Sequence, residues 1–362
     1  MTSFDGAEGE WPPVAYVANH GHLLLRSSSV HPAIAGLLRN PGLSFCCQNM
    51  QVPHPSESLG LRSRGVIASI AASVLFGVVY FIPAALGDLG TFEAVSWRII
   101  LTVPFMVVLL IAIKSWRSVV ATVRLIAARP LVVLPLVLVS SALLGLQLWL
   151  FAWGPSTGHG LDVAIGYLLM PLVMVVVGVI VHGERLGALR TVAVGAALVG
   201  VAAAFFAADG LSWATAAVAI GYPIYFVIRR ALGIDTPGAM LVELVILLVP
   251  SVWFAVGPGS VVAQGGELPI AMLVMFGAVS AVALTLYIVA SRLLSFSLFG
   301  LLSYVEPIVL VAVLIVLLGE SIDPSEYLTY AGIGLALVLL GVEGWRSVRS
   351  VPDAGEPPAV TS

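Results

Sequence analysis

Residues 91–113 read TFEAVSWRIILTVPFMVVLLIAI, and residues 114–130 read KSWRSVVATVRLIAARP. The first stretch is predominantly apolar and is long enough to cross a bilayer as a helix, because about 20 helical residues span the hydrocarbon core. The second stretch carries several basic residues and no acidic one. An apolar span followed by a short basic connection is typical of a membrane protein whose basic loops remain in the cytoplasm.

The same alternation extends over most of the chain, and it predicts ten membrane spans. We place them at 65–86, 91–113, 131–153, 160–181, 190–208, 212–228, 238–257, 269–290, 297–318 and 327–343. From Arg62 onward, every Lys and Arg except Arg98 falls at the two ends or in alternate connections: Arg62, Arg64, Lys114, Arg117, Arg124, Arg129, Arg185, Arg190, Arg229, Arg230, Arg292, Arg346 and Arg349. The other connections hold Asp88, Asp209, Glu267, Glu320, Asp323 and Glu326. This asymmetry predicts that both termini are cytoplasmic.

Composition supports an all-α membrane protein in the inner (plasma) membrane. Hydrophobic residues make up 60% of the chain and charged residues 10%, with a mean hydropathy of +1.08, whereas a soluble domain is about 25% charged. The connections are short, so we expect no soluble domain between the spans. The only cysteines, Cys46 and Cys47, form neither a disulfide framework nor a metal motif; they are either ordinary thiols or acylation sites.

The spans divide into two halves between two tails. We expect a disordered cytoplasmic tail over residues 1–64, a first five-helix unit over 65–208, a second over 209–345 and a cytoplasmic tail over 346–362. Met50 is a second candidate start. The N-terminal tail has no apolar run long enough for a signal peptide.

Prolines interrupt seven of the predicted spans, at Pro83, Pro104, Pro135, Pro171, Pro223, Pro250 and Pro307. Each removes a backbone hydrogen bond and bends its helix, which lipid tolerates only where neighbours or a cavity satisfy the freed carbonyl. The fifth and tenth spans lack proline and contain small residues four apart, Ala196 with Gly200 and Gly332 with Ala336. We therefore expect kinked helices around a cavity and two straight, closely packed helices outside it.

An internal repeat relates the two halves. Pro171 and Gly183-Glu184 recur at Pro307 and Gly319-Glu320, an offset of 136 residues, and Tyr167 and Tyr304 precede the two prolines. An offset of 145 places Glu243 opposite Arg98. Because each half has five spans, the second is expected to be inverted relative to the first. Inverted repeats with interrupted helices are typical of secondary transporters with a site at the membrane midplane.

These residues resemble the EamA-type drug/metabolite transporters. The resemblance lies in Phe76-Gly77, Trp97-Arg98, Gly166-Tyr167 with Pro171, Gly183-Glu184-Arg185, Tyr304-Val305-Glu306-Pro307 and Gly319-Glu320; residues 95–108, 148–186 and 240–243 are most similar to the RarD branch. It covers roughly residues 65–345 and implies a ten-helix carrier with a central cavity and alternating access. Met170 and Glu306 depart from the RarD pattern, and the substrate cannot be carried over.

Two intramembrane charges are the main candidates for a site. At about 1.5 Å per residue, Arg98 lies about 10 Å from the outer face and Glu306 about 13 Å from the inner face, so roughly 6 Å of depth separates them. We expect these two to pair rather than Arg98 and Glu243, which about 10 Å of depth separates. Glu306 is then either the carrier of a coupling proton or a static partner of Arg98.

Several uncharged residues are further candidates for lining the cavity: Gln147, Tyr80, Tyr167, Tyr225, Tyr287 and Tyr304. The alternative for each tyrosine is an interfacial anchor or packing. The sequence predicts a secondary transporter for a small metabolite or drug-like solute, with protons as a candidate coupling ion, as a monomer or homodimer. We expect no cofactor, metal or nucleic-acid partner. A sensor or assembly partner without flux is the alternative, and an intramembrane enzyme lacks its motifs, HExxH and GxSxG.

Overall fold

The computed structural model describes residues 55–83, 86, 89–207, 212–309 and 327–349. These residues are largely helical and contain no strand. The helices are α2 (Pro55–Phe81), α3 (Thr91–Ala112), α4 (Trp116–Ala128), α5 (Pro130–Ser156), α6 (Gly160–Ile180), α7 (Ala188–Ala207), α8 (Trp213–Leu232), α9 (Pro237–Val256), α10 (Ile270–Leu293), α11 (Phe296–Leu302) and α13 (Tyr327–Arg349). The predicted acidic positions Asp88, Asp209, Glu320, Asp323 and Glu326 and most of both predicted tails lie outside the described residues.

The long helices have the length and composition of membrane spans. Seven of them, α2, α3, α5, α6, α7, α9 and α10, are long and apolar enough to cross a bilayer, and the stretches Phe296–Val309 and Tyr327–Glu343 are shorter apolar helices. Helix α8 has 20 residues and carries Arg229 and Arg230 in its last turn. A helix satisfies its backbone hydrogen bonds within the segment, as hydrocarbon requires. The expected all-helical, multi-pass architecture is therefore confirmed.

Four details of the predicted organisation are wrong. Helix α2 begins at Pro55 and α13 runs to Arg349, so the inner ends of both predicted tails are helical. Helix α2 also ends at Phe81, which leaves Pro83 beyond the helix rather than at a kink within it. Residues 116–128, expected in a loop, form α4.

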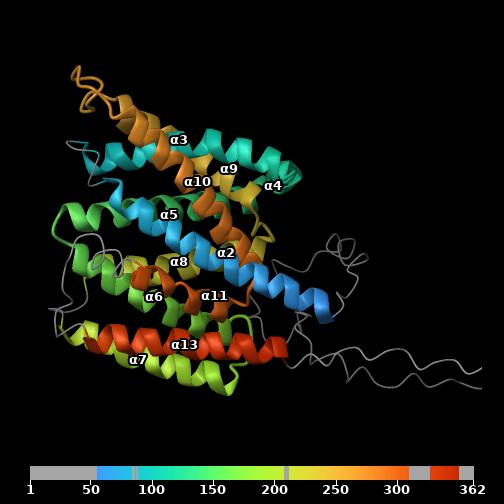
Figure 1. Cartoon of the computed structure of the whole chain (residues 1–362). Helices are drawn as coiled ribbons and strands as arrows, with labels where there is room; N and C mark the ends of the chain where they lie inside the picture. The colour runs from blue at the N-terminus through green and yellow to red at the C-terminus, as the bar shows by residue number, and fades with distance from the viewer. Residues whose placement is uncertain (1–54, 84–85, 87–88, 208–211, 310–326, 350–362) are drawn as a thin grey trace, which may run out of the picture. The chain divides into compact units, whose positions relative to one another are not determined.

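The small residues of the fifth and tenth spans bring α7 and α13 into close contact, as expected. A Cβ placed on Gly332 would lie 2.9 Å from the Cα of Gly200 and 2.7 Å from the carbonyl oxygen of Ala196. Real Cβ atoms do not approach other atoms so closely, so the two backbones touch only because both positions are glycine. Figure 1 shows these two helices side by side at one edge of the described bundle.

The remaining helices cross one another in a pattern that brings the two halves of the sequence together. Helix α3 packs against α9 and α10, and α10 also packs against α2; α5 packs against α8 and α9, and α6 against α8 and α11. Buried side chains from both halves form one continuous apolar core, including Phe76, Met106, Met174, Phe226 and Phe299. The polar side chains buried among these helices therefore come from distant parts of the chain.

Candidate functional site

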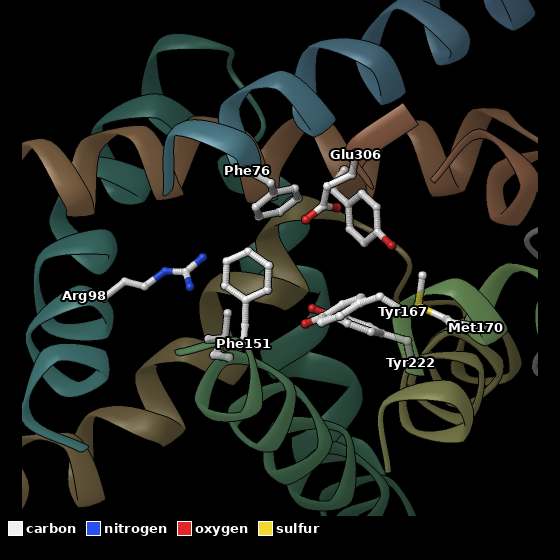
Figure 2. A pocket seen from close by; sticks show the side chains of 9 residues that line it. Phe76, Arg98, Phe151, Tyr167, Met170, Tyr222 and Glu306 are labelled. Atoms are coloured by element: carbon white, nitrogen blue, oxygen red, sulfur yellow. The ribbon is translucent and has the colours of Figure 1, made fainter. Parts of the chain in front are cut away.

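A small cavity lies where helices of both halves meet. It is lined by Phe76, Arg98, Leu148, Phe151, Tyr167, Met170, Tyr222, Tyr287 and Glu306. The space within it that the centre of a water molecule can reach is about 20 Å³. That volume accommodates water but no organic solute. Figure 2 shows the Arg98 guanidinium and the Glu306 carboxyl approaching the cavity from different sides, with aromatic rings around them.

Arg98 enters the cavity from the second turn of α3. Its side chain is buried, with 2% of the residue exposed. The Arg98 Nε donates to Ser280 Oγ of α10 at 2.9 Å, and its Cζ lies 5.2 Å from the centre of the Phe276 ring. These two contacts orient the guanidinium, since a ring face attracts a cation and the serine fixes one N–H. None of the described carboxylates forms an ion pair with Arg98.

Glu306 reaches the cavity because the ninth predicted span is interrupted. Helix α11 ends at Leu302, residues 303–304 form a turn, and helical backbone resumes at residue 305 just before Pro307. Non-helical backbone at membrane depth is tolerated where protein surrounds it or where it lines a cavity. The Tyr304 hydroxyl donates to the carbonyl oxygen of Leu168 at 2.8 Å and so fixes the turn to α6. Tyr304 was expected in the cavity wall, but it holds the wall in place instead.

The expected ion pair between Arg98 and Glu306 is not formed in this structure, although both residues line the same cavity. The orientation of the Arg98 side chain is set by Ser280 of α10, a partner that depth along the helices does not predict. The space between the two charges is the cavity.

Aromatic rings form much of the remaining wall. Tyr167 and Tyr287 line it as expected, and Tyr222 lies between them, with ring centres 6.3 Å from each. Phe151 packs edge-on against Tyr167 at 5.7 Å, and Phe76 packs edge-on against Tyr287 at 5.5 Å. Tyr222 was not among the residues predicted for the site. Its position directly before Pro223 is the available signal, since Tyr167 and Tyr304 also precede prolines.

Glu243 lies in a separate buried network and does not contact Arg98. Its carboxylate pairs with Arg229 and accepts hydrogen bonds from Ser140 and, at 3.0 Å, from Tyr225. Arg229 and Glu243 are both 0% exposed. Arg229 had been placed in a cytoplasmic connection. In the structure it lies in the last turn of α8, where Nη2 donates to the Thr236 carbonyl at 2.8 Å. Tyr225, too, belongs to this network and does not line the cavity.

Two other candidates also lie away from the cavity lining. Gln147 is fully buried and donates from Nε2 to the carbonyl oxygen of Ala217 at 2.8 Å, so it links α5 to α8. Gly221 faces that amide so closely that no Cβ fits there. Tyr80 packs edge-on against Phe151 at 5.2 Å, behind the lining. Pro171 lies inside α6 as expected.

The described part of the chain contains no cluster of three or more His, Cys, Asp or Glu side chains that could hold a metal ion. The cavity offers instead one cation, one carboxyl group and phenol hydroxyls on an apolar wall. These groups can bind a small polar molecule by charge and hydrogen bonds while rings cover its apolar part.

The chain is similar in sequence to several bacterial proteins. No family model matches it. The chloramphenicol-sensitive protein RarD of Pseudomonas aeruginosa is 35% identical over 299 residues, which cover 82% of this chain and 99% of the relative. An uncharacterized transporter of Pasteurella multocida is 36% identical over 282 residues, covering 78% of this chain and 96% of the relative. Protein RarD of Escherichia coli K12 is 26% identical, covering 79% and 96%.

A solved structure shares the fold. A protein of known crystal structure superimposes with a TM-score of 0.57 at 17% identity, covering 78% of this chain and 98% of its own. The relatives named RarD match nearly from end to end, and the described helices have the composition of membrane spans. The chain is thus a multi-pass inner-membrane protein that belongs to the RarD-like family of membrane transporters.

Proposed function

We propose that this protein is a secondary transporter that binds a small anionic or zwitterionic solute between Arg98 and Glu306 and moves it by alternating access. The observation that carries the proposal is the state of Arg98. Its guanidinium is buried at membrane depth, faces a cavity and forms no ion pair with a described carboxylate. A buried charge is costly unless something compensates it, and such charges in membranes generally mark a solute or ion pathway.

The internal counterpart of Arg98 supports this assignment. Glu243 occupies the matching position in α9, and each charge hydrogen-bonds a serine of the other half of the sequence, Ser280 for Arg98 and Ser140 for Glu243. Glu243 is compensated within the protein by Arg229. Arg98 has no such partner among the described residues. Of two related positions, one therefore stabilises the protein and the other is left to bind a ligand.

Helix packing supports a pair of inverted five-helix repeats with ten spans. If α2, α3, α5, α6 and α7 correspond to α8, α9, α10, α11 and α13, most contacts between these helices have a counterpart after the exchange of halves. The pair α2–α10 corresponds to α8–α5, α3–α10 to α9–α5, and α6–α8 to α11–α2. The pairs α3–α9, α6–α11 and α7–α13 correspond to themselves. A pseudo-two-fold axis through the bundle accounts for this pattern. In carriers built from two such repeats, access alternates as one repeat moves against the other.

The size of the cavity supports a closed conformation in this structure. Solute sites have volumes of about 300–1,000 Å³, whereas only about 20 Å³ is open to water centres here. A solute can enter only if the helices around the cavity separate. In an alternating-access cycle such a closed state lies between the two open ones.

Transport in proteoliposomes tests the proposal, with a panel of carboxylates, amino acids and uncharged analogues as candidate solutes. For any solute that is transported, Arg98→Gln should abolish uptake, and Arg98→Lys should retain part of it because the charge remains. Arg185→Gln is the control, since it removes an exposed arginine that does not line the cavity. Normal uptake by Arg98→Gln would refute the assignment.

Proton coupling belongs to the same proposal and needs a separate test. Glu306 is the only carboxylate among the residues that line the cavity, so it is the group there that can take up and release a proton in a transport cycle. Glu306→Gln keeps the shape and removes the charge. This variant should still exchange solute across the membrane but should not accumulate it in response to a pH gradient. Unchanged accumulation would leave Glu306 as a structural residue.

A further inference from the structure

Helix α4 lies on the basic side of the spans and is joined closely to two of them. Three residues separate it from the end of α3, and Arg129 alone separates it from α5. The chain turns sharply at Lys114, which has a φ of +55°, so α4 does not continue the direction of α3. Figure 1 shows α4 at the end of α3. Because α3 and α5 cross the membrane, α4 lies at the bilayer surface.

One side of α4 is fixed to the protein. Thr122 is buried, Val119 packs against the main core, and Leu125 and Ile126 pack against a small cluster at the ends of α5 and α9. Ser118 lies against Gly238 in the first turn of α9 with no room for a Cβ between them. These contacts hold the rotation of α4 about its axis, so its other side faces outward.

The outward side presents an apolar stripe. Trp116, Val120 and Val123 are 42%, 36% and 51% exposed, and Ala127 is also exposed. At 3.6 residues per turn these four side chains fall within about 60° of one another around the helix. An exposed apolar stripe on a helix at the bilayer surface is suited to the boundary between head groups and acyl chains.

Arginines flank this stripe. Arg117 and Arg124 lie about 80° from its centre on one side, at the same 3.6 residues per turn. Both are exposed, as are Lys114 and Arg129 at the two ends of the helix. No acidic residue occurs in residues 114–130, and none of these four cations forms an ion pair with a described carboxylate.

We propose that α4 is an interfacial helix whose stripe of Trp116, Val120 and Val123 enters the membrane and whose arginines bind the phosphates of acidic phospholipids. The stripe sets the depth of the helix, and that depth brings Arg117 and Arg124 to the level of the head groups. Arginine binds phosphate through paired N–H groups. Attraction to anionic lipid is worth about 1 kcal/mol per basic residue near the surface, or about a fivefold preference each.

The position of the stripe can be tested with nitroxide labels. Single cysteines at Val120 and Val123 are compared with one at Ala121, an exposed position on the same helix, in full-length protein whose Cys46 and Cys47 are serine. In phosphatidylglycerol–phosphatidylcholine vesicles, labels at Val120 and Val123 should be relaxed by oxygen, and the label at Ala121 by a water-soluble nickel complex. Strong nickel access at Val123 would place the stripe in water and overturn the proposal.

Lipid selectivity is tested with a fluorophore on Val123→Cys. Brominated phosphatidylglycerol should quench it at a mole fraction several-fold lower than brominated phosphatidylcholine does. Arg117→Gln with Arg124→Gln should bring the two lipids close to equal quenching. The matched control is Arg185→Gln with Arg292→Gln, which removes two exposed arginines from the same end of the spans and should leave the preference intact. Equal quenching in the parent, or equal loss in the control, would overturn the proposal.

Discussion

Two buried arginines of this protein should differ in how much stability the protein loses when their charge is removed. Arg229 is 0% exposed and pairs with the equally buried Glu243, and it also donates to the Thr236 carbonyl. Arg229→Gln leaves the Glu243 carboxylate buried without its cation, which typically costs about 3–5 kcal/mol. Arg98 has a single hydrogen bond to a neutral side chain. Arg98→Gln removes a cation that has no ion pair with a described carboxylate, along with that bond and the contact with the Phe276 ring, so we expect a change within about 1 kcal/mol.

The assay is the free energy of unfolding in mixed micelles, measured by circular dichroism as the fraction of sodium dodecyl sulfate rises. The double variant Arg229→Gln with Glu243→Gln is the internal check. It removes both charges and should therefore be more stable than Arg229→Gln alone. If Arg98→Gln destabilises the protein as much as Arg229→Gln does, Arg98 is a structural residue and not a solute-binding charge.

Three further predictions follow from the packing, the charge asymmetry and the loop contacts. Gly332→Ala should destabilise the protein by about 1–3 kcal/mol relative to Gly195→Ala, whose Cβ meets nothing within 4 Å, because α7 and α13 must separate; equal unfolding energies would refute this. A cysteine at Gln264 should react with a membrane-impermeant maleimide in intact cells and one at Gly187 should not, and the reverse pattern would invert the proposed topology. Glu184→Ala should lower the free energy of unfolding by about 2 kcal/mol, because that carboxylate accepts hydrogen bonds from the first two backbone N–H groups of α11 at 2.6 and 2.9 Å. An unchanged free energy of unfolding would show that the contact contributes nothing.

The spans could be read from the sequence because the solvent there is hydrocarbon. A segment such as 91–113 must be apolar over the thickness of the bilayer and must satisfy its own backbone hydrogen bonds, so length and composition suffice. The structure gives α3 as Thr91–Ala112. The close packing of α7 and α13 could also be predicted from the sequence, because small residues four apart in each segment indicate helices whose backbones can touch, as Gly200 and Gly332 do.

The partners of the buried polar groups could not be read in the same way. Sequence gives the depth of a residue along its helix but neither the rotation of that helix nor the neighbour it crosses. Arg229 had the sequence context of a loop residue, and only the packing of α8 against α5 and the short connection to α9 bring it to Glu243. Gln147 had a suitable depth for the cavity, but its side chain is turned toward α8.

The sequence alone determined that this protein is a bundle of membrane helices with a charge, Arg98, that hydrocarbon does not tolerate without compensation. Tertiary structure decided which charge is compensated. Arg98 and Glu243 occupy related positions, and helix packing supplies Glu243 with Arg229 while it leaves Arg98 facing a cavity. The physical reason is that solvation by lipid acts on each segment separately, whereas pairing depends on side chains from segments far apart in the chain.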